Sequence, residues 1–255
     1  MNPFRAIGAG LLALLRSAGA VALFAGQALA ALVRPPYFGG QLVQQIFKIG
    51  FLSLPVVGLT ALFTGAALAL NIYTGGSRFN AESFVPNIVA MGIVRELGPV
   101  IAALMLAGRV SSGIAAEIGA MRATEQIDAL HTLATDPMRY LIAPRVLAGV
   151  LVLPILVATA DIIGIYGGYL VSVHTLDFNP TIYVRNTWDF LSDWDIISGL
   201  IKAAVFGFIL TLMGCYHGYY AQGGAQGVGR DATNAVVAAA VLIFAANFLL
   251  TSLFV

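Results

Sequence analysis

The chain has 255 residues, of which 59% are hydrophobic and only 10% are charged, and its mean hydropathy is +0.90. A soluble domain carries charge at about a quarter of its positions, so this composition excludes a soluble globular protein and indicates an integral membrane protein. The net charge of +1 gives no indication of a nucleic-acid partner, and the single cysteine, Cys215, excludes an intrachain disulfide.

The first segment, residues 1–45, contains the apolar run AIGAGLLALLRSAGAVALFAGQALAALV. The sequence ALA at residues 28–30 resembles a signal-peptide cleavage site, and the length of the run also allows a true membrane span. Arg16 interrupts the run, however, and Arg5, Arg16 and Arg34 are placed to reach lipid headgroups. These features favour an amphipathic helix that lies at the membrane interface.

Five later stretches have the length of about 20 apolar residues that a helix needs to cross a bilayer. The predicted spans run over about 49–72, 84–107, 146–173, 196–219 and 235–255. No internal repeat or linker divides them, so residues 46–255 form one domain. We predict an all-α integral membrane protein with an interfacial N-terminal helix and five transmembrane helices.

The basic residues predict the orientation of the chain, because arginine and lysine gather in cytoplasmic loops. With the N-terminus inside, two basic residues, Arg78 and Arg185, fall on the outer side. Nine fall on the cytoplasmic side: Arg5, Arg16, Arg34, Lys48, Arg109, Arg122, Arg139, Arg145 and Arg230. We therefore expect a cytoplasmic N-terminus, an outer C-terminus and an acidic, aromatic outer loop over about 174–195.

The second span carries the sequence IVRELGPVIAALMLAGR, in which Arg95 and Glu96 adjoin and Pro99 follows. A charge at a helix centre costs about 2.5–3.5 kcal/mol on insertion, and a good apolar residue offsets only about 0.3–0.6 kcal/mol. Pro99 also has no amide hydrogen for the carbonyl of Arg95, four residues earlier, so a kink is expected there. The charged side of this helix should face protein or water rather than lipid.

Partners for the two charges are expected on other spans. Adjacent residues on a helix point in different directions, so a direct Arg95–Glu96 pair is strained. We expect Lys202 to pair with Glu96 and Asp161 to pair with Arg95. These four residues and Asn247 form the predicted intramembrane network, which is either purely structural or the wall of a cavity.

The segment between the second and third spans, GRVSSGIAAEIGAMRATEQIDALHTLATDPMRYLIAPR, is the polar centre of the chain. Ile118, Met121, Glu125 and Leu130 recur at roughly helical spacing, which predicts a short amphipathic helix over about 114–131. Such a helix is either a solvated connection or a docking helix for a cytoplasmic partner.

The stretch RELGPVIAALMLAGRVSSGIAAEIGAMRATEQIDALHTLATDPMRYLIAPRVLA resembles the signature region of the MlaE-type permeases, the membrane subunits of ABC lipid transporters that work with mammalian-cell-entry (MCE) proteins. The resemblance extends from about residue 44 to the C-terminus, including GIYGGYLV and LIKAAVFGF, and is weakest in the N-terminal helix. It implies a homodimer in the inner membrane that moves phospholipid between the inner and outer membranes. Two copies of a separate ATPase subunit would bind the cytoplasmic face, with a STAS-domain protein on the ATPase in some systems. A ring of MCE-domain proteins would bind the periplasmic face.

The resemblance also implies residue roles, with a lipid cavity between the first two spans and their symmetry mates. By position, the lipid-binding residues are Leu68, Asn71, Tyr73, Phe79, Arg95, Glu96 and Leu97. The predicted helix over 114–131 matches the coupling helix of the family, and its ATPase contacts are Glu117, Met121, Arg122, Glu125 and Asp128. Relatives can carry an acid at the position of Asn247, so here Lys202 is expected to bond Glu96 or a carbonyl instead.

No catalytic, metal or cofactor site is expected in this chain. It has no GxxxxGK[ST] phosphate loop, so ATP and magnesium would bind a partner ATPase, and its three histidines are too dispersed for a metal site. Two other functions remain. One is a proton-coupled secondary transporter that uses Glu96, Asp161 and Lys202, although no inverted repeat supports it. The other is a membrane scaffold that transports nothing.

Overall fold

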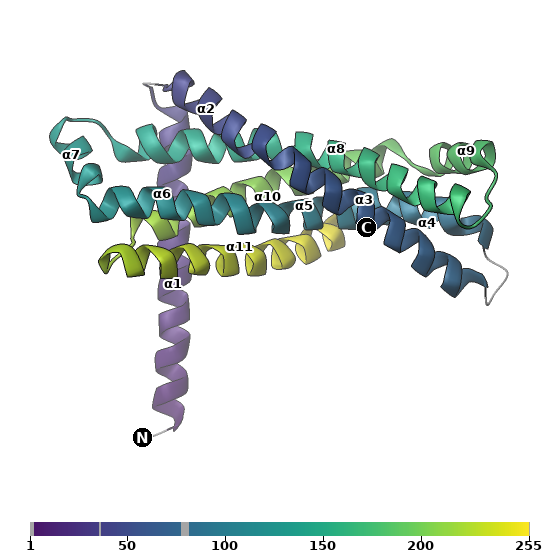
Figure 1. Ribbon diagram of the computed structural model, residues 1–255. Helices are drawn as coiled ribbons and strands as arrows, with labels where there is room; N and C mark the ends of the chain where they lie inside the picture. The colour runs from purple at the N-terminus through teal and green to yellow at the C-terminus, as the bar shows by residue number, and fades with distance from the viewer. Residues whose placement is uncertain (1–2, 36, 78–81, 255) are drawn as a thin grey trace.

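A computed structural model describes residues 3–35, 37–77 and 82–254, and within them the secondary structure is helical throughout, with no strand (Figure 1). Two residues named above, Arg78 and Phe79, lie outside the described residues. The α-helices are α1 (Pro3–Val33), α2 (Gly39–Ile49), α3 (Leu54–Gly76), α4 (Val85–Gly92), α5 (Gly98–Leu106), α6 (Ser112–Ala123), α7 (Gln126–Thr132), α8 (Ala143–His174), α9 (Pro180–Phe190), α10 (Asp193–Tyr219) and α11 (Gly224–Phe254). Two 3₁₀ turns, η1 (Phe51–Ser53) and η3 (Glu82–Phe84), and three π-turns, η4 (Ile93–Leu97), η5 (Ala107–Ser111) and η6 (Met138–Ile142), join some of them.

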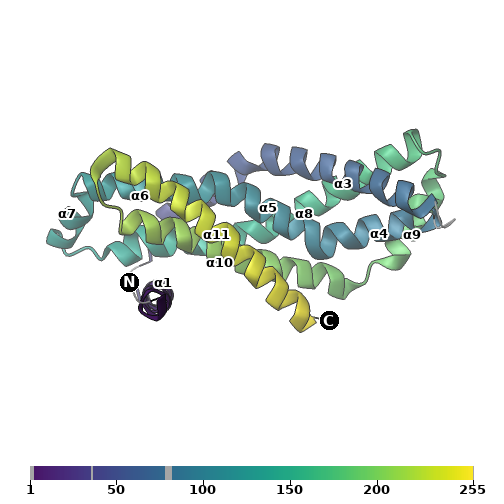
Figure 2. The same cartoon turned by 90° about the horizontal axis from the view of Figure 1, so that it is seen from below.

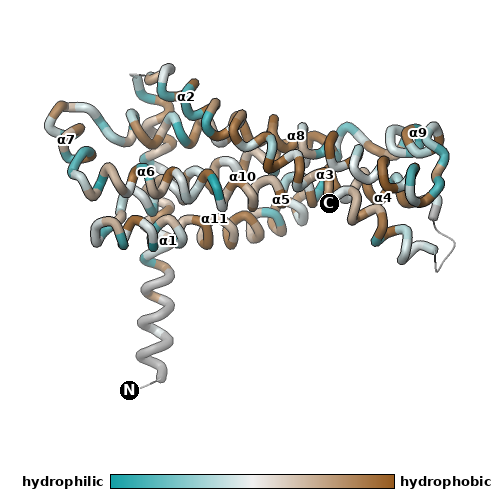
Figure 3. Tube along the Cα trace, in the orientation of Figure 1, coloured by the Kyte–Doolittle hydropathy of each residue, from teal (hydrophilic) through white to brown (hydrophobic). Residues whose placement is uncertain are grey.

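Within the described residues, six helical segments are long and apolar enough to cross a membrane. Five of them coincide with the five predicted spans, which are therefore confirmed in position, and each extends beyond the predicted apolar stretch at one end or both. They are Gly39–Gly76, Val85–Ala123, Met138–His174, Asp193–Tyr219 and Gly224–Phe254. The sixth, Leu15–Val33, lies in α1. Apolar residues predominate along α3 and α8, whereas polar residues gather around α7 at one end of the bundle (Figure 3).

The helix α1 runs across the direction of the other long helices. Figure 1 shows it along its length, and Figure 2, turned by 90°, shows it end-on beside the bundle. Phe24 and Ala28 of α1 are almost fully buried in the main core, and the Phe24 ring lies 5.5 Å from that of Tyr216. Cleavage after Ala30 would remove both side chains from the core, which argues against the signal-peptide interpretation.

Glycines bring α3 and α8 into close contact. A β-carbon on Gly65 would overlap the carbonyl of Gly164, and one on Gly167 would overlap the carbonyl of Leu62. Small residues allow helix backbones in a membrane to approach in this way. Gly164 and Gly168, four residues apart in α8, both lie close to backbone carbonyls of α3, those of Ala61 and Gly65.

The prediction of one continuous helix over 114–131 is wrong, because two helices cover this range. The second span continues through α6 to Ala123, and α7 begins only at Gln126. Between them Glu125 has a φ of 60°, a left-handed conformation that is uncommon for residues other than glycine. Ile118 of α6 and Ile127 of α7 are both fully buried in the main core, so apolar packing holds the two short helices together across the break.

The outer loop expected over 174–195 contains a helix, α9, that the sequence analysis missed. The side chain of Asn179 accepts hydrogen bonds from the backbone amides of Thr181 and Ile182, at 3.0 and 3.2 Å, and Pro180 occupies the first helical position. Asparagine followed by proline is a favourable start for a helix. The signal was therefore present in the sequence.

We predict that Gly65→Ala lowers the stability of the protein by about 1–3 kcal/mol, because the added methyl group forces α3 away from α8. Gly75→Ala in the same helix is the matched control, since a β-carbon there meets nothing within 4 Å. The temperature at which each purified variant loses its monodisperse size-exclusion peak measures the effect. Equal temperatures for the two variants would rule out the tight contact.

Candidate functional site

The second span is interrupted at its charged pair by the π-turn η4. Pro99 cannot donate to the carbonyl of Arg95, and the amide of Gly98 instead bonds the carbonyl of Ile93, five residues back. The carbonyl of Arg95 is thereby left for a side chain. The disruption predicted at Pro99 takes the form of a π-turn, a feature that is frequent at functional sites.

Lys202 of α10 bonds this free carbonyl. Its Nζ donates to the carbonyl of Arg95 at 2.8 Å, to Oε1 of Glu96 at 2.7 Å and to Oγ1 of Thr251 at 2.8 Å. These three bonds use all three donors of the ammonium group. The Lys202 side chain is only 3% exposed, whereas that of Glu96 is 37% exposed. The predicted Lys202–Glu96 pair and the bond from Lys202 to a backbone carbonyl are both confirmed.

Two neutral side chains of α11 complete the group. Asn247 Nδ2 donates to Oε2 of Glu96 at 2.9 Å, and Thr251 Oγ1 donates to Oε1 of Glu96 at 2.9 Å. Thr251 was not predicted, although it lies four residues after Asn247 and so shares its helix face. We call Lys202, Glu96, Asn247, Thr251 and the carbonyl of Arg95 the Lys202 cluster. It joins three membrane-spanning segments within an apolar bundle.

Arg95 pairs with a residue outside the Lys202 cluster. Its Nε lies 3.6 Å from Oδ1 of Asp195, so the predicted Arg95–Asp161 pair is wrong. Asp195 was assigned to the outer loop, but it lies in the first turn of α10, where it forms a capping box with Ser192. Asp161 lies beside Gly98, and its buried Oδ1 has no hydrogen-bond partner among the described residues.

The lipid-binding residues predicted from the resemblance do not form one pocket within a single chain. Leu68 and Tyr73 pack against a small apolar cluster of α3 and α4, and Asn71 is exposed. Phe79 lies outside the described residues. Leu97 lines a groove between α3 and α5.

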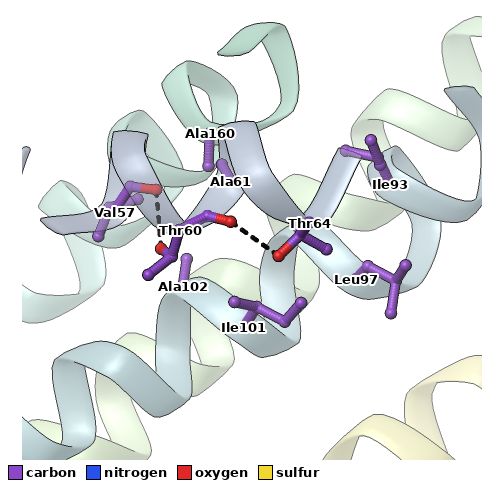
Figure 4. Close-up of a pocket in the computed structure, with 10 residues that line it drawn as sticks. Val57, Thr60, Ala61, Thr64, Ile93, Leu97, Ile101, Ala102 and Ala160 are labelled. Carbon is purple, nitrogen blue, oxygen red and sulfur yellow. Dashed lines mark hydrogen bonds between the residues drawn. The ribbon is translucent and has the colours of Figure 1, made fainter. Parts of the chain in front are cut away.

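This groove holds about 10 Å³ of free volume, no more than one water molecule occupies. Figure 4 shows Thr60 and Thr64 of α3 near Ile101 and Ala102 of α5. Both threonine hydroxyls donate to carbonyls of the preceding turn of α3, so they offer no free donor to a ligand. A lipid cavity on this side needs a wall that a single chain does not supply.

At the α7 end of the bundle, Glu117 joins three segments. Its Oε2 lies 3.1 Å from Nη2 of Arg145 in α8, and its Oε1 lies 3.3 Å from Nζ of Lys48 in α2. The Arg145 side chain is only 6% exposed, so it depends on Glu117 as a counter-ion. Sequence reasoning assigned Glu117 to ATPase contact and missed this structural bond, because Lys48 and Arg145 were considered only as loop charges.

The other predicted coupling residues lie around the break between α6 and α7. Arg122 Nη1 donates to Oδ1 of Asp128 at 2.7 Å, which ties the two helices together. Glu125 is exposed, and Met121 is half-buried against the main core.

We predict that Lys202→Met destabilises the protein by about 3 kcal/mol, the lower end of the range for buried ion pairs, because Glu96 loses its cation but stays partly exposed. Adding Glu96→Gln removes the remaining charge and should recover most of that loss. Thermal unfolding of the single and double variants measures the difference. A double variant no more stable than Lys202→Met alone would be inconsistent with the ion pair.

Glu117→Lys is expected to destabilise the protein by about 2–3 kcal/mol, because Arg145 is left buried without an acid. Asp128→Lys is the control: its ion pair is exposed, so the change should stay within about 0.5 kcal/mol. The same unfolding assay compares them. If the two variants have the same unfolding temperature, the ion pairs of Glu117 do not stabilise the contact of α6 with α2 and α8.

Comparison with known proteins gives the family of the chain. The profile of the Permease MlaE family matches residues 42–253. A probable ABC transporter permease protein of Rickettsia felis is 50% identical over 254 residues, which cover 100% of this chain and 98% of the relative.

Two further relatives carry more specific names. The intermembrane phospholipid transport system permease protein MlaE of Haemophilus influenzae is 38% identical over 213 residues, which cover 83% of this chain and 82% of that protein. Protein TRIGALACTOSYLDIACYLGLYCEROL 1, chloroplastic, of Arabidopsis thaliana is 36% identical over 234 residues, which cover 92% of this chain and 67% of that protein. The resemblance seen in the sequence is thus confirmed: this multi-pass membrane protein belongs to the MlaE permease family.

Proposed function

We propose that the chain is the membrane subunit of an ABC transporter that moves phospholipid between the inner and outer membranes. Family membership and the name of the Haemophilus influenzae relative support this function. The sequence has no phosphate loop of its own, so a separate ATPase subunit would hydrolyse ATP. This chain would then supply the path of the lipid.

The observation that carries the proposal is the position of the Lys202 cluster. A charged group in the middle of a membrane-spanning helix is costly against lipid, and such groups face protein or a water-lined cavity. Glu96 is nevertheless 37% exposed on a single chain. Only 11% of the most apolar stretch of α11 is buried within the chain. The helix that carries Asn247 and Thr251 of the Lys202 cluster is therefore mostly uncovered. A second copy of the chain would cover this side.

In the proposed homodimer, Glu96 and Leu97 of both copies face a shared lipid cavity. Arg95 supplies a cation that suits a lipid phosphate, and Leu97 supplies apolar wall for the acyl chains. Leu68, Asn71, Tyr73 and Phe79 are the further proposed lipid contacts, toward the outer end of the first two spans.

The partner subunits are assigned to opposite ends of the bundle. We place the two ATPase subunits at the α6–α7 break, one on each copy, with any STAS-domain protein bound to the ATPase. The MCE-domain ring is placed at the α9 end. Because α1 lies across the bundle near its α7 end (Figure 1), an interfacial position on the cytoplasmic side suits it. The N-terminus is then cytoplasmic, and α11 carries the C-terminus toward the periplasm.

We predict that Pro99→Ala reduces the phospholipid that co-purifies with the complex several-fold while the ATPase subunit is retained. The new amide hydrogen of residue 99 competes with Lys202 for the carbonyl of Arg95 and favours regular helix. Pro154→Ala, inside α8 and outside the Lys202 cluster, is the matched control. Mass spectrometry of extracted lipid gives the result. Normal lipid content in the Pro99→Ala variant would contradict the proposal that η4 forms a wall of the lipid cavity.

Glu125→Lys is expected to weaken binding of the ATPase subunit by about 1–2 kcal/mol, because it reverses an exposed charge at the centre of the proposed docking site. The unfolding temperature should not change. Arg185→Glu in α9, at the opposite end of the bundle, is the control. Quantitative co-purification from membranes measures retention. If the Glu125 variant retains the ATPase fully, the α6–α7 break is not the docking site.

A further inference from the structure

A large cavity lies on the other side of η4, between α8, α9 and α10. Its volume is about 600 Å³, within the range of about 300–1,000 Å³ that is typical of ligand sites. Its walls include Ile165 of α8, Val184 of α9, Leu200 of α10 and Val94 of η4. None of the lipid contacts proposed above lines it, so it would be a second site.

One wall of this cavity carries an acid with no partner. Asp161 lines the cavity and is only 8% exposed, and its Oδ1 is buried without a hydrogen bond to any described residue. A β-carbon on Gly98 would overlap this oxygen, so the carboxyl group lies directly against the backbone of α5. Buried polar groups are almost always hydrogen-bonded, and each exception needs an explanation. A ligand that donates a hydrogen bond to Asp161 supplies one.

The mouth of the cavity is apolar and exposed. Ile162, Tyr166 and Trp188 line it and are 70%, 53% and 72% exposed. Two of these side chains belong to the membrane-spanning helix α8, and Trp188 belongs to α9, an aromatic residue of the kind that marks membrane interfaces. A ligand therefore enters from the bilayer and is itself a lipid.

The charges of the lining select the headgroup. Among the described residues that line the cavity there is no Lys, Arg or His. A phosphate or carboxylate headgroup would bring an anion beside Asp161 with no cation to neutralise it, which is costly in an apolar site. An uncharged head with a hydroxyl donor satisfies Asp161 without this cost.

We propose that this cavity binds a single-chain lipid whose uncharged, hydroxyl-bearing head donates a hydrogen bond to Asp161. Monoacylglycerols are lipids of this class. The acyl chain fills the space among Ile165, Val184 and Leu200. Because Val94 belongs to the same π-turn as Glu96, the occupant contacts the back of the turn that carries the Lys202 cluster.

Trp188 reports on occupancy. The chain has two tryptophans, so Trp194→Phe leaves Trp188 as the single tryptophan, whose emission is excited selectively over that of the tyrosines. The full-length protein in nanodiscs is titrated with a monoacylglycerol brominated on its chain, which quenches a neighbouring tryptophan. The equally brominated methyl ester, which has no donor, and the brominated lysophosphatidate, which has a phosphate, are the control lipids. We expect half-quenching by the monoacylglycerol at a roughly tenfold lower mole fraction than by either control.

Variants at two lining positions distinguish the contribution of the hydrogen bond to Asp161 from that of the free volume of the cavity. Asp161→Leu should abolish the preference for the monoacylglycerol, and Asp161→Asn, which keeps an acceptor oxygen, should retain part of it. Ala158→Phe fills the cavity from α8 and should weaken quenching by all three lipids several-fold. Equal quenching of the Trp194→Phe protein by the three lipids, or none by any of them, would overturn the proposal even if Asp161→Leu does not fold.

Discussion

The hydrogen bond from Lys202 to the carbonyl of Arg95 is the interaction on which the centre of this permease depends. Pro99 leaves that carbonyl without its helical donor, and the buried ammonium group takes the place of the missing amide at 2.8 Å. The same ammonium group holds Glu96 at 2.7 Å, so one residue repairs the backbone and neutralises the acid. A charged pair next to a helix breaker is in this way compatible with a membrane span.

Residues of the π-turn η4 face or bond neighbouring elements on several sides. Val94 faces the cavity beside α8, Arg95 pairs with Asp195 at the start of α10, Glu96 bonds α10 and α11, and Leu97 lines the groove toward α3. A change in the geometry of this turn would therefore be felt on all sides of the bundle. The other two π-turns of the described chain also carry arginines that reach other elements: Arg109 bonds Ser53 at 2.6 Å, and Arg139 bonds the carbonyl of Pro35 at 2.8 Å.

Much of the fold could be predicted from the sequence, because length and hydropathy suffice to locate membrane spans. The Lys202–Glu96 pair followed from the cost of burying either charge alone. The partner of Arg95 did not follow, for a geometric reason. A π-turn adds one residue to a helical turn. Because each residue of an α-helix advances by about 100° around the axis, the extra residue turns the later side chains by about that angle from the directions that a regular helix predicts. Asp195 was in addition counted as loop, since hydropathy alone does not show that a capping box extends α10 past its apolar part.

The break between α6 and α7 was missed because the apolar spacing continues across it, while the backbone turns at Glu125. For the site, the roles of Glu96 and Leu97 in lipid contact rest on a second copy of the chain, whose position no single-chain pattern encodes.

We propose that the Lys202 cluster faces a lipid cavity shared by two copies of the chain. A cryo-electron microscopy map of the transporter purified in nanodiscs, with its own bound lipid, would show whether this cavity exists. We expect lipid density between two copies, with Glu96 and Leu97 of both copies at the wall of the cavity. A map in which Glu96 lies in a dry helix contact, remote from any lipid, would contradict it.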